Sequence, residues 1–298
     1  MKCTAIVITY NGMKWYDKCF GSLLNSDFHL SIIAVDNKST DTTIDYLLEK
    51  YPQIQLIQNE SNYGFTRANN IAIKTAYDSD SDYYFLLNQD AWIEKDTIQK
   101  LIDFSQNHSE YGIISPVHLS ADKNHFDRGF LRCFNVLSET SHAYENIYLK
   151  KEQECYDTVF VNAAAWLITR KCLETVGGFD AIMFKHWGED TNYCHRVLYH
   201  NFKIGIVPTA SICHDRDNRQ ENILDLNISY AIKYANILSG KKVYIKRFLA
   251  IIIKIITIKH IKNGIKELFF VLINMQNIIK SRKRNKVQGE GLKYIFES

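Results

Sequence analysis

The sequence lacks several features that identify other classes of protein. Only three of its 298 residues are proline, and no internal repeat has the period of a solenoid or a propeller. The seven cysteines form no Cys-x-x-Cys pair, so neither a zinc site nor a disulfide framework is indicated, and we expect a reducing cytosol. We find no signal peptide in residues 1–9. No run reaches the roughly 18 apolar residues that span a bilayer.

A Gly-x-Gly-x-x-Gly turn is also missing after the first apolar run, which disfavours a dinucleotide-dependent oxidoreductase. The chain does contain enough apolar material for a sizeable core, since 46% of its residues are hydrophobic and 23% are charged. This balance excludes a disordered or low-complexity chain. Its length allows one large domain with an appendage, or two modest domains.

Short apolar runs alternate with helical patterns over the first 120 residues. This alternation predicts an α/β fold with a mostly parallel sheet and helices on both faces. Strands are predicted at residues 4–9, 31–35, 54–57, 83–87 and 112–115. Further along, we expect a strand-like segment over 159–169, a helix over 189–201 and a strand over 203–207.

Polar residues follow three of the predicted strands at the edge where such sheets bind ligands. The segments are Thr9-Tyr10-Asn11-Gly12, residues 36–41 and Asn88-Gln89-Asp90. Asp36 can accept hydrogen bonds from a ribose or a base, or it can simply cap the next helix. Asp90 suits a hard divalent cation, which commonly uses one or two carboxylates together with substrate phosphates. Alternatively, Asp90 begins a helix over 93–104.

The order and spacing of several motifs resemble glycosyltransferase family 2. The matching segments are residues 5–11, Asp36-Asn37-x-Ser39-x-Asp41, Asn62-x-Gly64-Phe65-x-x-Ala68-Asn69-Asn70, residues 86–90, residues 177–180, Gly188-Glu189-Asp190 with Arg196, and His214. The resemblance covers residues 3–236. Within the family, the sequence is similar to the rhamnosyltransferase-like and galactofuranosyltransferase-like branch, which builds bacterial surface polysaccharides. It implies a GT-A fold over residues 1–235 and an inverting, metal-dependent transferase.

The resemblance also implies roles for individual residues. It places Thr9, Tyr10, Asn11 and Asp36 around the nucleotide, and Asn62, Gly64, Arg67 and Asn69 near the donor diphosphate and sugar. The expected donor is a nucleoside-diphosphate sugar, dTDP-rhamnose or a UDP-hexose. The expected acceptor is a glycan or a lipid-linked glycan. A guanidinium such as that of Arg67 can bind a diphosphate through two charged hydrogen bonds, although a lone arginine on a helix is usually just solvated.

The metal motif departs from the family pattern, because Asn88 stands where an aspartate is common. An amide adds no charge, so the affinity for a metal depends more on Asp90. Asn88 and Gln89 are assigned to donor binding. Relatives carry a metal-binding histidine about two dozen residues after the Glu-Asp pair, which points to His214. Imidazole suits Mn²⁺ better than Mg²⁺. The alternative is a structural histidine that ends the 204–213 segment.

Glu189 and Asp190 begin a predicted helix, where the helix macrodipole favours an ionised carboxylate. We assign Asp190 as the base that accepts the proton of the acceptor hydroxyl, and Glu189 as a residue that orients the acceptor. The reverse assignment and simple helix capping remain open. His186 and Trp187 are expected on the acceptor side, because aromatic side chains commonly stack on sugars.

Residues 236–298 form a basic amphipathic region that we predict to be helical. Its basic residues between 241 and 286 are Lys241, Lys242, Lys246, Arg247, Lys254, Lys259, Lys262, Lys266, Lys280, Arg282, Lys283, Arg284 and Lys286. On a helical wheel one polar face holds Lys259, Lys262, Asn263, Lys266, Asn277 and Lys280, opposite Ile261, Ile265, Leu268, Leu272 and Ile279. This pattern suits an anionic membrane surface. The alternative is packing on the catalytic domain or in a homo-oligomer. Nucleic acid is disfavoured because the basic residues are interleaved with bulky aliphatic residues rather than forming a groove with exposed stacking aromatics.

Two hypotheses for function remain. The first is a sugar transferase acting as a peripheral protein at the inner face of the cytoplasmic membrane. The second, motivated by Asn88, is a catalytically impaired nucleotide-sugar-binding partner of a transferase complex.

Overall fold

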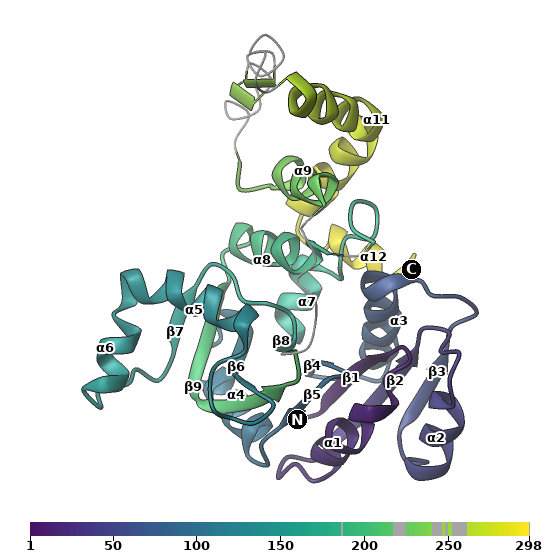
Figure 1. Ribbon diagram of the computed structural model, residues 1–298, viewed down its shortest axis with the longest axis vertical. Helices are drawn as coiled ribbons and strands as arrows, with labels where there is room; N and C mark the ends of the chain where they lie inside the picture. The colour runs from purple at the N-terminus through teal and green to yellow at the C-terminus, as the bar shows by residue number, and fades with distance from the viewer. Residues whose placement is uncertain (186, 217–224, 240–245, 248–249, 252–260, 298) are drawn as a thin grey trace.

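The computed structural model describes residues 1–297 apart from 186, 217–224, 240–245, 248–249 and 252–260 (Figure 1). The strands are β1 (Cys3–Thr9), β2 (Leu30–Asp36), β3 (Gln55–Gln58), β4 (Tyr83–Asn88), β5 (Ala91–Ile93), β6 (Tyr111–Ser120), β7 (Tyr156–Thr158), β8 (Ala165–Thr169) and β9 (Lys203–His214). The helices of the body are α1 (Met13–Leu24), α2 (Thr43–Lys50), α3 (Gly64–Asp78), α4 (Thr97–Asn107), α5 (Arg128–Ser141), α6 (Ala143–Tyr148), α7 (Arg170–Val176) and α8 (Glu189–Tyr199). The C-terminal helices are α9 (Leu226–Ala235), α11 (Ile261–Lys286) and α12 (Lys293–Phe296), with a 3₁₀ turn, η2, at Glu290–Leu292.

One mixed sheet organises the body of the protein. Its strand order is β3-β2-β1-β4-β8-β6-β9-β5, and β7 pairs with β9. The first four strands are parallel, and β8 is antiparallel to β4. Their register sets Thr9 beside Asp36 and Ile8 beside Asn88. The polar residues that end these strands therefore meet at one edge of the sheet.

The strands are apolar on both faces because each face packs on helices. On one face, Ile6, Ile33 and Val35 share a core with residues of α3, α7 and α8. On the other face, Ala5 and Val7 share a core with residues of α1, α2 and α4. Two buried faces explain why the strands read as continuous apolar runs rather than as an alternating pattern.

Most of the predicted elements are present, with informative differences. β6 and β9 are longer than predicted, since they extend to Ser120 and His214. The predicted strand over 159–169 is only partly correct, because β8 covers 165–169 and β7 ends before residue 159. The segment after Asp90 is not the start of a helix, because β5 lies there and α4 begins at Thr97.

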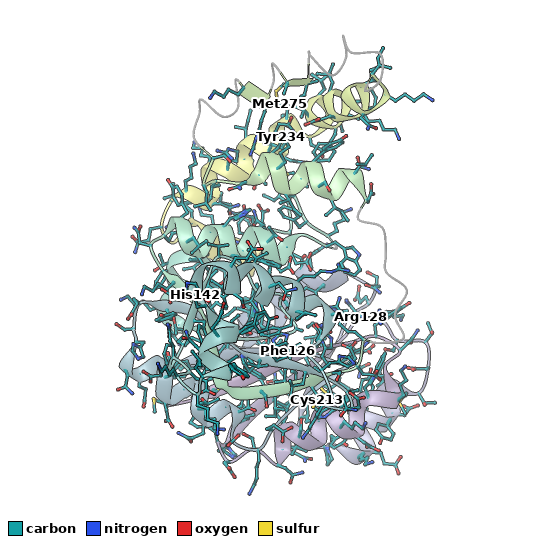
Figure 2. The ribbon with its side chains drawn as sticks, turned by 60° about the vertical axis from the view of Figure 1, so that its left-hand side comes forward. Phe126, Arg128, His142, Cys213, Tyr234 and Met275 are labelled. Atoms are coloured by element: carbon teal, nitrogen blue, oxygen red, sulfur yellow. The ribbon has the colours of Figure 1, made fainter. Side chains whose placement is uncertain are left out.

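Helices α9 and α11 lie beyond the α8 side of the body, while α12 lies against α3 (Figure 1). Glu267, the single acidic residue in the sequence between 241 and 286, is fully buried and bonds to Lys233 and to the Tyr234 hydroxyl, which joins α11 to α9. Tyr234 and Met275 both lie in this helical region in Figure 2. No helix among the described residues is both long and apolar enough to span a membrane.

The end of α11 is joined to the body by buried polar contacts. The Asp180 carboxylate accepts hydrogen bonds from Ser281 and from Asn285 Nδ2, the latter at 2.9 Å. The fully buried Arg196 donates to the carbonyl oxygens of Val176 and Gly178, and its guanidinium lies 5.3 Å from the ring centre of Tyr294.

Gly177 and Gly291 make a close backbone contact at this junction. A β-carbon on Gly177 would lie 1.9 Å from the Gly291 carbonyl carbon, and Gly177 has a φ of 88°. Only glycine fits both constraints. Ser281, Asn285, Gly291 and Tyr294 are therefore part of the packing of the body.

We predict that Asp180→Ala lowers the free energy of unfolding by about 3 kcal/mol, because buried donors on Ser281 and Asn285 lose a charged acceptor. Asp78→Ala serves as the control, since Asp78 makes only an exposed pair with Lys74 and should cost at most about 0.5 kcal/mol. Urea unfolding measures both values. Equal losses in the two variants would contradict this role of Asp180.

Candidate active site

Asp36 lies at the centre of a buried network at the ends of β1 and β2. Its carboxylate accepts hydrogen bonds from Thr9 Oγ1 at 3.1 Å, from Ser39 N at 2.9 Å and from Ser39 Oγ at 2.5 Å. Asn11 continues the network, since its N–H donates to Ser39 Oγ and its side chain accepts from Thr40 N. Asp36 thus shapes the turn after β2, while the exposed Tyr10 and Asn11 form the surface of the predicted nucleotide site.

Gln89 holds the turn after β1. Its amide accepts from Tyr10 N at 2.8 Å and donates to Tyr10 O at 3.1 Å. A β-carbon on Gly12 would lie 2.4 Å from Gln89 Oε1, so this position favours glycine. We had assigned Gln89 to the donor, and the structure places its amide on the backbone of Tyr10.

The segment from Asn62 to Asn69 forms the start of α3. Asn62 Oδ1 accepts from Gly64 N, and Gly64 has a φ of 78°, a conformation that favours glycine. Asn69 is buried and donates to Phe65 O within the helix. Arg67 is exposed, with its guanidinium 4.8 Å from the ring centre of Tyr63.

Arg67 faces a hollow of about 390 Å³. The residues that line it are Asn62, Tyr63, Arg67, Ala181, Ile182, Lys185, Arg284, Tyr294 and Glu297. Three of these side chains are basic and one is acidic, so the hollow suits an anionic group.

The two predicted metal ligands lie together. His214 ends β9 and pairs with Ala91 of β5, the residue after Asp90. His214 Nε2 lies 3.3 Å from Asp90 Oδ1, and both side chains are buried. Among the described residues neither ring nitrogen of His214 makes a hydrogen bond. Asn88 lies at the end of β4, and its backbone N–H donates to Ala164 O.

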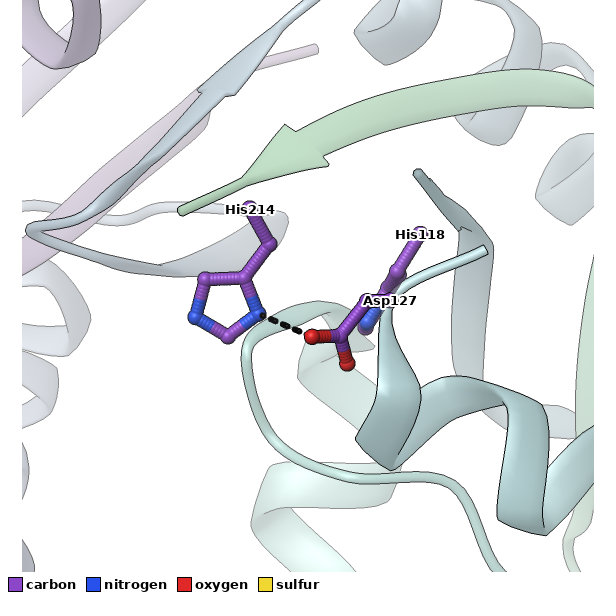
Figure 3. Close-up of side chains that lie close together, drawn as sticks. All are labelled: His118, Asp127 and His214. Atoms are coloured by element: carbon purple, nitrogen blue, oxygen red, sulfur yellow. Dashed lines mark ion pairs between the residues drawn. The ribbon is translucent and has the colours of Figure 1, made fainter. Parts of the chain in front are cut away.

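Two further residues, which we did not select from the sequence, lie beside His214. Figure 3 shows His118 and Asp127 close to the imidazole, with Asp127 Oδ2 3.7 Å from His214 Nδ1. One ligand atom from each of the three residues lies within 4.8 Å of the others. Asp127 precedes a helix and looked like an ordinary cap, and His118 lies within an apolar strand. Only the pairing of β6 with β9, which sets Ser120 beside His214, brings them to the site.

Glu189 and Asp190 begin α8 as predicted. Burial, and to a lesser extent the charge of the neighbouring Asp190 carboxylate, raise the pKa of Glu189 to about 8. Burial also raises the pKa of Asp190, while hydrogen bonds from Thr191 and the guanidinium of Arg216 oppose that shift. Glu189 therefore holds its proton more firmly than an ordinary glutamate.

Trp187 precedes this pair and is half exposed, with a φ of 69° that is rare for a bulky side chain. The indole lies at the surface, two residues before Glu189 in the chain. His186 lies outside the described residues.

Arg216 connects the two halves of the site. Its Nη1 lies 3.8 Å from Asp127 Oδ1, and its charge acts on Asp190. These side chains are neighbours in space. Asp90 lies next to His214, His214 next to Asp127, and Asp127 next to Arg216. The charge of Arg216 in turn acts on Asp190. The structure brings the predicted metal ligands and the predicted base to one region.

Residues 4–177 match the family model described as glycosyl transferase family 2. The chain belongs to glycosyl transferase family 2. It is a glycosyltransferase, and the predicted family is confirmed.

Individual relatives agree with this assignment. The chain is 23% identical to dTDP-rhamnosyl transferase RfbF of Shigella flexneri, over 95% of this chain and 90% of the relative. It is 22% identical to N-acetylglucosaminyl-diphospho-decaprenol L-rhamnosyltransferase of Mycobacterium tuberculosis, over 71% of this chain and 75% of the relative. These relatives support the rhamnosyltransferase-like branch.

A solved structure confirms the GT-A fold. The structure of GalNAc-T7 with UDP, GalNAc and Mn²⁺ matches with a TM-score of 0.65 at 12% identity. The match covers all of this chain and 56% of that one, so this chain spans about half the length of GalNAc-T7.

The raised pKa of Glu189 predicts a specific dependence of stability on pH. A carboxyl group whose pKa is about 8 in the folded chain and 4.5 ordinarily stabilises the fold at low pH. That contribution is lost as pH rises from about 4.5 through about 8. Glu189→Gln should therefore lose less thermal stability than the wild type across this range. Melting temperatures that change with pH in the same way in the wild type and the variant would contradict the prediction. Glu49→Gln is the control, because the Glu49 side chain on α2 is exposed.

Proposed function

We propose that the chain is an inverting, metal-dependent glycosyltransferase that moves a sugar from a nucleoside diphosphate to a hydroxyl group of a growing glycan. The observation that carries this proposal is the buried pair of Asp90 Oδ1 and His214 Nε2, 3.3 Å apart at the edge of the sheet. Thr9 and Asp36 end neighbouring strands at the same edge. A donor bound across this edge would have its diphosphate near the pair.

The residues present fit a divalent cation. A carboxylate oxygen and an imidazole nitrogen are ligands that Mn²⁺ accepts, and imidazole suits Mn²⁺ better than Mg²⁺. The ring nitrogens of His214 make no hydrogen bond with the described residues, although the side chain is buried. Asp90 and His214 would hold the cation, which neutralises charge on the departing diphosphate. GalNAc-T7, which shares the fold, was solved with UDP and Mn²⁺.

Asp190 is the proposed base. Its carboxylate accepts a hydrogen bond from Thr191 N at 2.7 Å and lies near the Arg216 guanidinium, and both favour the ionised form. Glu189, with a pKa of about 8, is protonated at neutral pH and can donate a hydrogen bond to the acceptor. One ionised carboxylate on the acceptor side suffices for inversion. Trp187 offers an exposed aromatic surface for the acceptor sugar.

The relatives narrow the proposed donor and acceptor. RfbF is a dTDP-rhamnosyl transferase, and the mycobacterial relative transfers L-rhamnose to a decaprenol-linked sugar. We therefore favour dTDP-rhamnose over a UDP-hexose, and a lipid-linked or growing surface polysaccharide as the acceptor.

Release of nucleoside diphosphate from a panel of activated sugars tests the proposal. With Mn²⁺ and acceptor present, Asp190→Asn should lower turnover by about a hundred- to ten-thousand-fold, because the acceptor hydroxyl loses its base. Asp90→Asn should lower turnover and weaken its dependence on Mn²⁺. Asp96→Asn is the matched control, since Asp96 pairs with Lys100 at the surface.

The alternative function is a nucleotide-sugar-binding partner without activity, as Asn88 suggests. Calorimetric titration separates the two proposals. Binding of a donor without release of nucleoside diphosphate in any metal would favour the partner and overturn the enzymatic proposal.

The C-terminal region is proposed to bind an anionic membrane surface from the cytoplasmic side. The exposed apolar residues of α11 are Ile261, Ile265, Phe269, Leu272, Ile273, Met275 and Ile279. Exposed lysines accompany them at 262, 266, 280 and 283, and apolar side chains with cations suit an anionic interface. Four basic residues of the region lie outside the described residues, namely Lys241, Lys242, Lys254 and Lys259.

Deleting the whole region would also remove the buried contacts of Arg196 and Asp180, so a single substitution tests membrane binding more cleanly. Leu272→Asp should reduce sedimentation with anionic vesicles about tenfold or more, since a Leu side chain contributes about 1.5–3 kcal/mol when buried. Leu48→Asp on α2 is the control, because Leu48 is 54% exposed and Leu272 is 57% exposed. Equal sedimentation of the two variants, or none by the wild type, would contradict membrane binding through α11.

A further inference from the structure

We propose that Asp127 is a positioning residue of the metal site, which fixes the orientation and tautomer of His214 from the side opposite Asp90. The inference rests on the metal site of the proposed function. It concerns a residue that has no place in the motifs of the family resemblance.

His214 lies between two buried carboxylates. Nε2 faces Asp90 Oδ1 at 3.3 Å, and Nδ1 faces Asp127 Oδ2 at 3.7 Å. Asp90 and Asp127 are 1% and 2% exposed, so water does not screen either pair effectively. Because the two nitrogens of one ring point in different directions, a cation shared by Asp90 and Nε2 leaves Nδ1 directed toward Asp127.

Asp127 is held in a fixed position. Its N–H donates to His118 O at 2.9 Å, and its Oδ1 accepts from Phe130 N at 3.0 Å as the cap of α5. Arg216 Nη1 lies 3.8 Å from the same Oδ1 atom. The helix cap and the guanidinium both engage Oδ1, and Oδ2 is the oxygen that faces His214.

This arrangement fits one tautomer of a metal-bound His214. When a cation lies between Asp90 and Nε2, the neutral ring carries its proton on Nδ1, and the Asp127 carboxylate 3.7 Å away stabilises that tautomer. In that tautomer the Nε2 lone pair and Asp90 Oδ1, which lie 3.3 Å apart, can both face the cation. Metal-binding histidines commonly donate their other N–H to such a partner, and loss of the partner weakens metal binding about ten- to a hundredfold.

Two other arrangements make different predictions. In one, His118, Asp127 and His214 themselves hold the cation, since their ligand atoms cluster within 4.8 Å. In the other, Asp127 only caps α5.

The experiment measures Mn²⁺ affinity of the full chain from the electron paramagnetic resonance signal of the free ion. Asp127→Asn keeps a good helix cap but removes the charge and can present an N–H to His214. Asp225→Asn is the matched control, because Asp225 caps α9 through Asn227 N in the same way. His214→Ala, Asp90→Asn and His118→Gln complete the set, and melting temperatures report folding.

We expect Asp127→Asn to bind Mn²⁺ about ten- to a hundredfold more weakly, while its melting temperature stays near that of the wild type. Asp225→Asn and His118→Gln should bind like the wild type. An unchanged affinity in Asp127→Asn, with binding lost in His214→Ala and Asp90→Asn, would overturn this inference and leave the metal site intact. Loss in His118→Gln equal to that in His214→Ala would assign Asp127 as a ligand and overturn its positioning role. Wild-type affinity in His214→Ala and Asp90→Asn would overturn both the metal site and the inference.

Discussion

The pairing of β5 with β9 is the contact on which the site depends. It sets Ala91 beside His214 and so brings Asp90 to His214 from a distant part of the chain. The parallel pairing of β6 with β9 adds His118, and the turn that follows β6 adds Asp127. These strands place two carboxylates and two imidazoles in a buried region where each interaction is weakly screened.

The C-terminal region has two roles in the architecture. Its inner side packs on the body, where Asn285 donates a hydrogen bond to Asp180 and the Tyr294 ring lies beside the Arg196 guanidinium. Its outer side exposes apolar side chains and lysines of α11. A single helix therefore combines structural support for the loop before α8 with a surface suited to a lipid interface. The Asp180 contacts link this helix to the segment that leads to Glu189 and Asp190.

Local patterns predicted much of this structure. The apolar runs predicted β1 to β4. The family resemblance pointed to Asp90, Asp190 and His214, and it also supplied the spacing that relates His214 to Asp190. Sequence could not find Asp127 or His118, because one resembles a helix cap and the other lies in an apolar strand. Nor did a helical wheel show that Glu267 faces inward, since that depends on Lys233 and Tyr234 in α9.

The central claim is that Asp90 and His214 hold a divalent cation beside the donor diphosphate. The most direct measurement is a crystal structure of the chain with Mn²⁺ and a nucleoside diphosphate, collected near the manganese absorption edge. The account predicts an anomalous peak in contact with both Asp90 and His214 Nε2 and with the diphosphate. A peak elsewhere, or a bound diphosphate with no peak beside these residues, would contradict it.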